Sequence, residues 1–238
     1  MVARRLRALG KWVLRFLTLS GPDFRRHMTY AWSRIATKVV PESALSEHAR
    51  FRRWSRGRLI PTIPDWGSPS VIYGGYLGDS SVAVLRAGES ELHVYEPFPP
   101  FVSALRERFE GDERVTVHEY AVARREAVVA MTDALDATSV GTGEVRVAAK
   151  AASETLKDFE SVFFLEMNIE GSEYEVLDEL IATGAISKVR NLWVQFHNLD
   201  EEDELRRALI RRKLCRTHEC RVSFTFVWEW WTIGQGVC

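Results

Sequence analysis

The chain is predicted to be an α/β protein, with a mostly parallel sheet, helices on both faces and a β-hairpin at its carboxyl end. Short apolar segments alternate with segments of helical spacing, which is typical of parallel strands joined by right-handed crossovers. The first apolar segment, residues 71–73, runs into a glycine turn, and polar residues follow later ones. Because parallel strands end at one edge of a sheet, these polar residues are expected to meet at a ligand-binding edge.

The amino-terminal region is strongly basic. Residues 1–60 hold 14 Lys or Arg against three acidic residues, whereas residues 61–238 hold 18 against 30. On a helix, the first 17 residues separate into an apolar face (Val2, Leu6, Leu9, Val13, Phe16 and Leu17) and a basic face (Arg4, Arg7, Lys11 and Arg15). Two interpretations stay open: peripheral contact with an anionic membrane surface, or packing of the apolar face against the core or against a second subunit in a dimer.

Two further helical segments are expected, at 23–40 and 41–60. The proline-rich segment PTIPDWGSPS that follows is typical of a linker. The sequence therefore predicts a basic helical extension over residues 1–66 and an α/β domain over residues 67–238.

The α/β domain is expected to alternate strands and helices. Strands are predicted at 70–73, 91–95, 114–119, 161–168 and 189–196, with short strands near 126–131 and 145–149 and two closing strands within 214–233. Helices are predicted at 79–87, 99–109, 173–183 and 201–212. The polar, glycine-containing loop 133–144 is long enough to act as a lid.

The glycine turn after the first strand indicates a nucleotide-type ligand. Gly74, Gly75 and Gly78 allow close approach of the backbone, and Glu96 ends the next strand 22 residues after Gly74. An acidic residue at about this distance accepts hydrogen bonds from ribose hydroxyls. The G-G-x-x-G spacing lacks the pyrophosphate-binding turn, which favours an adenosine ligand without a pyrophosphate. An NAD-linked reductase is disfavoured for the same reason, and no Tyr-x-x-x-Lys pair is present.

Polar side chains also follow two of the later strands. Asn168 ends one strand, with Glu170 and Glu173 just beyond it, and His197 follows the next. These residues are expected at the same edge of the sheet as the glycine turn.

Four separated segments, GGYLGDSS, YEP, NIEGSEYEVL and QFHN, give the chain a family resemblance over roughly residues 68–231. In this order they resemble the FkbM family of S-adenosylmethionine-dependent methyltransferases. The resemblance implies a Rossmann-like class I methyltransferase domain with a seven-stranded sheet, S-adenosylmethionine as cofactor, and O-methylation of a hydroxyl on a sugar, glycan or polyketide-type small molecule. A catalytically degenerate binding or scaffold protein on the same fold is the alternative.

The resemblance also implies which residues hold the methyl donor. Gly74, Gly75, Tyr76 and Gly78 would line its methionine part, Asp79 and Ser80 would meet its carboxylate, Glu96 would hold the ribose, and Glu119, Tyr120 and Ala121 would meet the adenine edge. The start of the helix after the turn suits a carboxylate because its backbone N–H groups point outward.

Methyl transfer to a hydroxyl benefits from a general base. His197 is the predicted base, because the ordinary pKa of imidazole lies near neutrality. Glu170 and Glu173 are alternatives, either as base or for holding the amino group of the donor. Asn168 offers both a hydrogen-bond donor and an acceptor.

Three positions depart from the family pattern. Ile72 stands where an acidic residue is frequent, Glu166 where a lysine is frequent, and Asn168 where an aspartate is frequent. Ile72 removes an acidic group that would contribute to donor binding. Glu166 and Asn168 change the residues that would give their strand a catalytic or substrate-orienting role.

The cysteine content, the length of the apolar runs and the absence of nucleic-acid-binding motifs limit which other kinds of protein the chain can be. Three cysteines form neither a C-x-x-C pair nor a zinc pattern, which predicts a reduced, cytoplasmic protein with no metal site. No apolar run approaches the roughly 18 residues of a membrane-spanning helix. No zinc-finger, RNP or helix-turn-helix pattern accompanies the arginines, so the expected partner is a small-molecule or glycan acceptor and not a nucleic acid.

Overall fold

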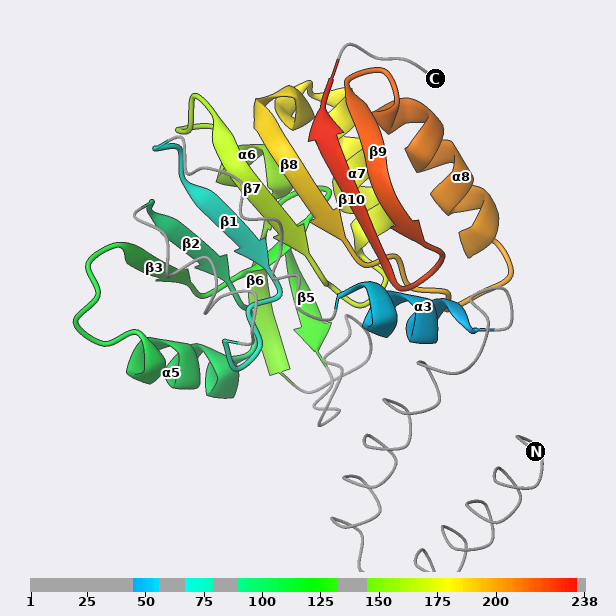
Figure 1. Cartoon of the computed structure of the whole chain (residues 1–238). Coiled ribbons are helices and arrows are strands. Elements are labelled where there is room, and N and C mark those ends of the chain that lie inside the picture. The colour runs from blue at the N-terminus through cyan, green and yellow to red at the C-terminus, as the bar shows by residue number, and fades with distance from the viewer. Residues whose placement is uncertain (1–44, 56–66, 79–89, 132–144, 235–238) are drawn as a thin grey trace, which may run out of the picture. The chain divides into compact units, whose positions relative to one another are not determined.

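The computed structural model describes residues 45–55, 67–78, 90–131 and 145–234 (Figure 1). The chain forms two units, Met1–Trp54 and Ser55–Cys238. In the first, the structure describes helix α3 (Glu47–Trp54), inside the helical segment expected at 41–60. The predicted amphipathic helix, the helix at 79–87, the lid loop, Asp79 and Ser80 all lie outside the described residues, so these predictions stay predictions, as does the boundary at residue 66.

A seven-stranded sheet forms the centre of the second unit, in the order β3-β2-β1-β7-β8-β10-β9 (Figure 1). Its strands are β1 (Ser70–Tyr73), β2 (Leu92–Tyr95), β3 (Val115–His118), β7 (Val162–Met167), β8 (Val189–Val194), β9 (His218–Phe224) and β10 (Trp228–Ile233). The first five in this order pair in parallel, and β10 is antiparallel to both of its neighbours. The predicted Rossmann-like class I methyltransferase architecture and its closing hairpin are confirmed.

The strand order reverses between β1 and β7. The chain runs outward from β1 to β2 and β3, and then returns so that β7 pairs with the other side of β1. Open parallel sheets bind ligands beyond the carboxyl ends of the strands at such a switch point. Gly74 follows β1 there and Asn168 follows β7, so the topology alone brings two of the predicted segments together.

Helices cover both faces of the sheet. Helices α7 (Glu173–Ala182) and α8 (Asp203–Leu214) share one core with the strands, through side chains that include Leu177, Leu180 and Ile210. Helix α5 (Pro99–Arg108) lies on the opposite face, where Leu105 and Val94 close over Gly75. The side chains of a strand alternate between faces, which explains why β2 contributes to both layers.

A second, three-stranded sheet was not predicted. It consists of β4 (Ala121–Ala123), β5 (Ala127–Met131) and β6 (Val145–Ala151), in the order β4-β6-β5. The sequence predicts β5 and β6 as two short strands but not β4, which has three residues and pairs with β6. It also missed helix α6 (Ala152–Thr155) and the 3₁₀ helix η2 (Ala185–Lys188). Such short elements depend on distant partners more than on local periodicity.

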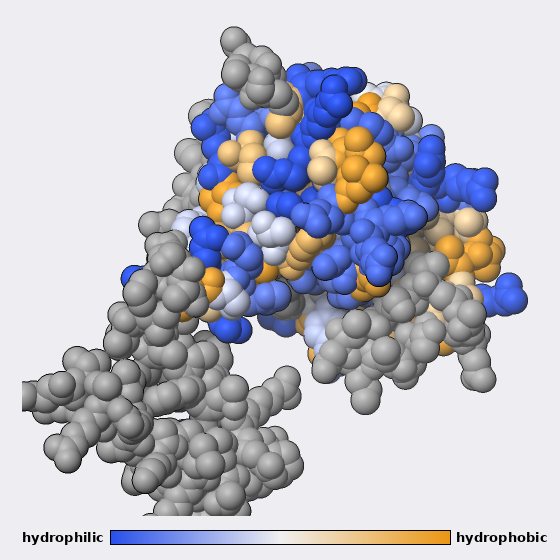
Figure 2. Space-filling view, turned by 90° about the vertical axis from the view of Figure 1, so that its right-hand side faces the viewer, coloured by the Kyte–Doolittle hydropathy of each residue, from blue (hydrophilic) through white to orange (hydrophobic). Residues whose placement is uncertain are grey.

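The side of the molecule that faces right in Figure 1 is mostly hydrophilic, with separate apolar patches (Figure 2). Helix α8 contributes five basic residues to the second unit, but also exposes Leu205 and Leu209. Among the described helices, none combines the length and apolar character needed to cross a bilayer.

Candidate functional site

The turn after β1 accepts only glycine at its first position. Gly74 has a φ of +85°, and a Cβ there would lie 2.1 Å from the backbone oxygen of Asn168. At Gly75 a Cβ would lie 2.3 Å from Cγ1 of Val94. The contact at Gly74 brings the chain after β1 directly against the chain after β7, and the contact at Gly75 brings it against β2. The predicted donor-binding turn and Asn168 therefore meet at the switch point.

Glu96 is fixed against this turn from the neighbouring strand. The backbone N–H of Tyr76 donates to its Oε2 (2.8 Å), and the N–H of Phe98 donates to its Oε1 (3.0 Å). Only 4% of Glu96 is exposed. Burial raises the pKa of the carboxyl group, and the two N–H donors oppose that shift. Each carboxylate oxygen has a second acceptor position, so Glu96 can still accept a pair of hydroxyl hydrogen bonds.

Tyr76 has a φ of +47°, in the left-handed region that a non-glycine residue adopts at a cost. Its ring packs edge-on against Phe101 of α5, with 4.6 Å between ring centroids. Strain of this kind is concentrated at ligand-binding sites, where it is held by the surrounding structure.

The three residues predicted to meet the adenine edge are not brought together. Glu119 pairs with Arg106 at 3.0 Å, and both side chains are about half exposed. Tyr120 instead lies beneath the ammonium group of Lys150, 4.3 Å from its ring centroid. Ala121 is buried in the small sheet. The chain changes direction from one sheet to the other here, which separates the three side chains.

Glu173 organises the segment that carries His197. Its Oε1 accepts from the backbone N–H of His197 (2.6 Å) and lies 2.9 Å from His197 Nδ1, while its Oε2 accepts from the N–H of Gly171 (2.8 Å). The hydroxyl of Tyr174 donates to the backbone oxygen of His197. Glu173 is fully buried. It thus holds the imidazole ring and the two loops around it, and presents no oxygen to solvent.

Glu170 faces the other side of the same imidazole. Its Oε2 lies 3.3 Å from Nε2 of His197, and 27% of its side chain is exposed, against 13% for His197. Glu170 has a φ of +50°, a conformation that costs roughly 1–3 kcal/mol outside glycine. The strain turns an accessible carboxylate toward His197 at the ligand-binding edge.

The two carboxylates keep His197 protonated at neutral pH. Burial lowers its pKa, but hydrogen bonds and charge attraction from Glu170 and Glu173 outweigh burial and raise the pKa to about 10. A protonated imidazole donates through both nitrogens and has no free lone pair. At neutral pH, His197 therefore lacks the lone pair that its predicted role as general base requires.

This protonation predicts a pH dependence of stability. The folded-state pKa of about 10 lies above the ordinary value of 6.5, so the stabilisation from His197 is fully present below pH 6.5 and is lost as pH rises toward 10. Urea unfolding at several pH values is expected to show a difference between wild type and His197→Gln that shrinks over this range. A constant difference from pH 6 to pH 10 would contradict the assignment.

Of the three departures from the family pattern, Asn168 directly follows β7, and Ile72 and Glu166 lie in β1 and β7. The backbone N–H of Asn168 donates to Tyr73 (3.1 Å), and its side-chain Oδ1 is buried without a hydrogen-bond partner among the described residues. A buried acceptor of this kind is open to a hydrogen-bond donor from a ligand or from a water molecule. Ile72 and Glu166 are paired in register on β1 and β7 and are both buried, so they lie inside the sheet.

The sequence did not reveal that Glu170 and Glu173 enclose a single imidazole. The spacing E-G-S-E contained a signal, because a glycine with a φ of +101° at Gly171 reverses the chain between the two carboxylates.

Within the described residues, no group of three or more His, Cys, Asp and Glu side chains suits a metal ion.

Several solved structures are similar to this chain at low sequence identity. Fibrillarin from Methanococcus jannaschii, a pre-rRNA processing protein, is 10% identical over 74% of this chain and 70% of its own, with a TM-score of 0.46. Aeropyrum pernix fibrillarin with natively bound S-adenosyl-L-methionine gives the same four values, 10%, 74%, 70% and 0.46. The N-terminal domain of human METTL16 in complex with SAH is 10% identical over 83% of this chain and 72% of its own, with a TM-score of 0.41.

No family model matches the chain, and no curated protein matches it by sequence.

Proposed function

We propose that this chain is an S-adenosylmethionine-dependent methyltransferase that methylates a hydroxyl group. The observation that carries the proposal is Glu96, a buried carboxylate held by two backbone N–H groups against a glycine turn at the switch point. The resemblance of the four sequence segments to the FkbM family supports the same activity.

The residues at this edge suit the donor. Glu96 would accept hydrogen bonds from both ribose hydroxyls, and Oδ1 of Asn168 would accept from the amino group. S-adenosylmethionine supplies, when bound, a methyl group activated by a positively charged sulfur. Gly74, Gly75, Tyr76 and Gly78 would form the floor of this site.

Glu170 is the proposed general base. It is the more exposed of the two carboxylates around His197, so an acceptor hydroxyl could approach it. The hydroxyl would release its proton to Oε1 or Oε2 as its oxygen bonds to the methyl carbon and the bond between that carbon and the donor sulfur breaks. The His197 imidazolium orients Glu170 from one side, and Glu173 fixes His197 from the other. His197 and Glu173 are then positioning residues, and Asn168 borders the donor.

The acceptor is proposed to be a hydroxyl on a sugar, glycan or polyketide-type small molecule, in line with the family resemblance. Transfer of a tritium-labelled methyl group from the donor to panels of hydroxylated glycans, polyketide-type alcohols and RNA tests this directly. Label in the first or second panel is expected. Label in RNA alone would replace the acceptor class, and donor binding without transfer to any panel would favour the alternative of a catalytically degenerate binding protein.

A further inference from the structure

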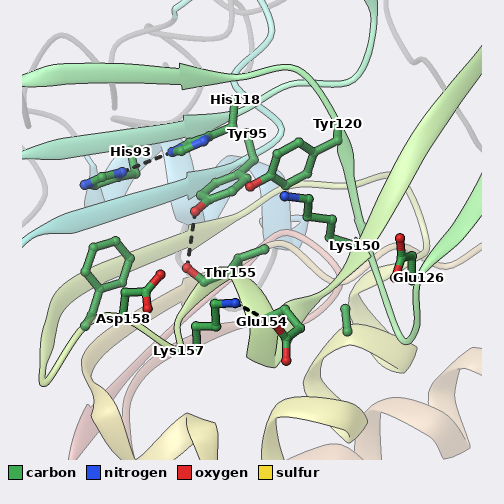
Figure 3. A pocket seen from close by; sticks show the side chains of 12 residues that line it. His93, Tyr95, His118, Tyr120, Glu126, Lys150, Glu154, Thr155, Lys157 and Asp158 are labelled. Atoms are coloured by element: carbon green, nitrogen blue, oxygen red, sulfur yellow. Dashed lines mark hydrogen bonds and ion pairs between the residues drawn. The ribbon is translucent and has the colours of Figure 1, made fainter.

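A separate cavity of about 640 Å³ lies over β2 and β3, where α6 and the segment 157–159 form its other wall (Figure 3). It is lined by aromatic rings and by charged groups at its rim. No residue in the proposed transfer mechanism lines it.

The cavity and the donor site lie on opposite faces of β2. Val94 faces Gly75 on the donor side, so its strand neighbours His93 and Tyr95 face the other way, into the cavity. His93 also precedes Glu96 by three strand positions, about 10 Å. A ligand in this cavity would therefore be a second one.

Two histidines make a flat wall in the cavity. Nδ1 of His93 lies 3.0 Å from Nε2 of His118, and their ring planes differ by 15°. A hydrogen bond between ring nitrogens lies in the ring planes, so the two imidazoles extend one another edge to edge. Tyr95 stacks on His118, with centroids 4.3 Å apart and planes 11° apart.

The ring of His93 has a different environment from that of His118. Phe159 meets it at 63°, with 4.8 Å between centroids. Among the described residues, no aromatic ring stacks in parallel on His93 in the way that Tyr95 stacks on His118. His93, Tyr95 and Phe159 all line the cavity, so Tyr95 and Phe159 are the aromatic neighbours of a ligand that stacks on His93 there.

The wall is uncharged at neutral pH. Burial lowers the pKa of His118 to about 4, with further contributions from His93 and Lys150. Burial also lowers the pKa of His93, against the opposing influence of Glu91. Neutral imidazoles offer one donor and one acceptor each, and they are poor counterions for an anion.

The rim favours a ligand that donates hydrogen bonds. Glu126, Glu154 and Asp158 stand there against two lysines. One lysine, Lys157, already pairs with Glu154 at 3.1 Å, and the other, Lys150, lies over the ring of Tyr120. The excess of carboxylates opposes a phosphate or carboxylate ligand and suits amino groups.

We propose that this cavity binds a flat, uncharged nitrogen heterocycle with an exocyclic amino group, of the nucleobase kind, stacked on His93 between Tyr95 and Phe159. The amino group would donate to the rim carboxylates. This second site does not depend on the proposed methyl transfer.

Calorimetric titration with four nucleosides, in the absence and presence of saturating S-adenosylhomocysteine, tests the site. Cytidine and guanosine carry an exocyclic amino group, and uridine and inosine are their counterparts without it. The amino nucleosides are expected to bind at least roughly tenfold more tightly, since they add hydrogen bonds to charged acceptors. Saturating S-adenosylhomocysteine is expected to leave that binding unchanged.

Variants separate this site from the donor site. His93→Leu and Phe159→Leu are expected to weaken cytidine binding roughly tenfold or more and to leave S-adenosylhomocysteine binding unchanged. Glu96→Ala is expected to weaken S-adenosylhomocysteine binding and to leave cytidine binding unchanged. The exposed Glu107 on α5 provides a control, Glu107→Gln, that should change neither. Cytidine binding by a wild type that fails to bind S-adenosylhomocysteine would overturn the proposed function alone.

Three results would overturn the second site. These are no saturable binding of any nucleoside, displacement of cytidine by S-adenosylhomocysteine, or undiminished cytidine affinity in both leucine variants that retain the wild-type unfolding midpoint.

Discussion

Glu170→Gln is expected to lower kcat by about 10²–10⁴-fold, the range that a positioned general base contributes. Glutamine keeps the size of the side chain but cannot take the proton of the acceptor hydroxyl. Glu170 pairs with His197, whereas Glu96 is held by the N–H groups of Tyr76 and Phe98. The dissociation constant of the methyl donor is therefore expected to stay unchanged. Initial rates at saturating donor, together with donor titrations, measure both quantities.

The control for Glu170→Gln is Glu175→Gln, which removes an exposed carboxylate from the first turn of α7. It is expected to keep wild-type kcat. The pH profile provides a second check. Because His197 has a pKa of about 10, the rate is expected to stay level from pH 7 to 9 and to fall as the imidazolium that orients Glu170 loses its proton. A rate that climbs steadily from pH 8 to 10 would instead make neutral His197 the base.

Gly74→Ala is expected to destabilise the fold by about 2–5 kcal/mol, from a left-handed conformation and an overpacked contact together. The new Cβ would lie 2.1 Å from the backbone oxygen of Asn168. Because this contact is with the backbone, and not with the end of a flexible side chain, it cannot be relieved by a change of rotamer. The free energy of unfolding in urea measures the loss.

Gly184→Ala isolates the contribution of the contact at Gly74. Gly184 has a similar φ, +79°, but a Cβ there has nothing within 4 Å, so only the backbone conformation is penalised, by roughly 1–2 kcal/mol. Equal losses in the two variants would mean that the chain after β1 does not lie against Asn168.

The parallel sheet could be predicted because its determinants are local and repeated. β7 is a short, nearly continuous apolar segment, and Tyr174, Leu177 and Leu180 recur in α7 at helical spacing. Glu96 could be located as well, since a fixed topology places the residue after β2 beside the turn after β1.

The remaining features depend on contacts that the sequence does not display. The strand β4 forms because Ala121–Ala123 pairs with β6. As a result, the side chains of Tyr120 and Ala121 have surroundings different from that of Glu119. The pKa of His197 depends on two carboxylates that the left-handed conformations at Glu170 and Gly171 place on either side of the ring. Residue types suggested the chemistry, but these conformations decide which group carries the proton.

Calorimetric titration of the full chain with S-adenosylhomocysteine, the product of the proposed donor, tests the central claim most directly. Wild type is expected to bind with micromolar affinity, and Glu96→Ala to lose roughly 1.5–3 kcal/mol of binding free energy, the usual value for hydrogen bonds to a charged group. The exposed variant Glu107→Gln on α5 is expected to bind like wild type. Absence of binding by the wild type, or equal affinity in Glu96→Ala, would contradict the assignment of this edge of the sheet as a methyl-donor site.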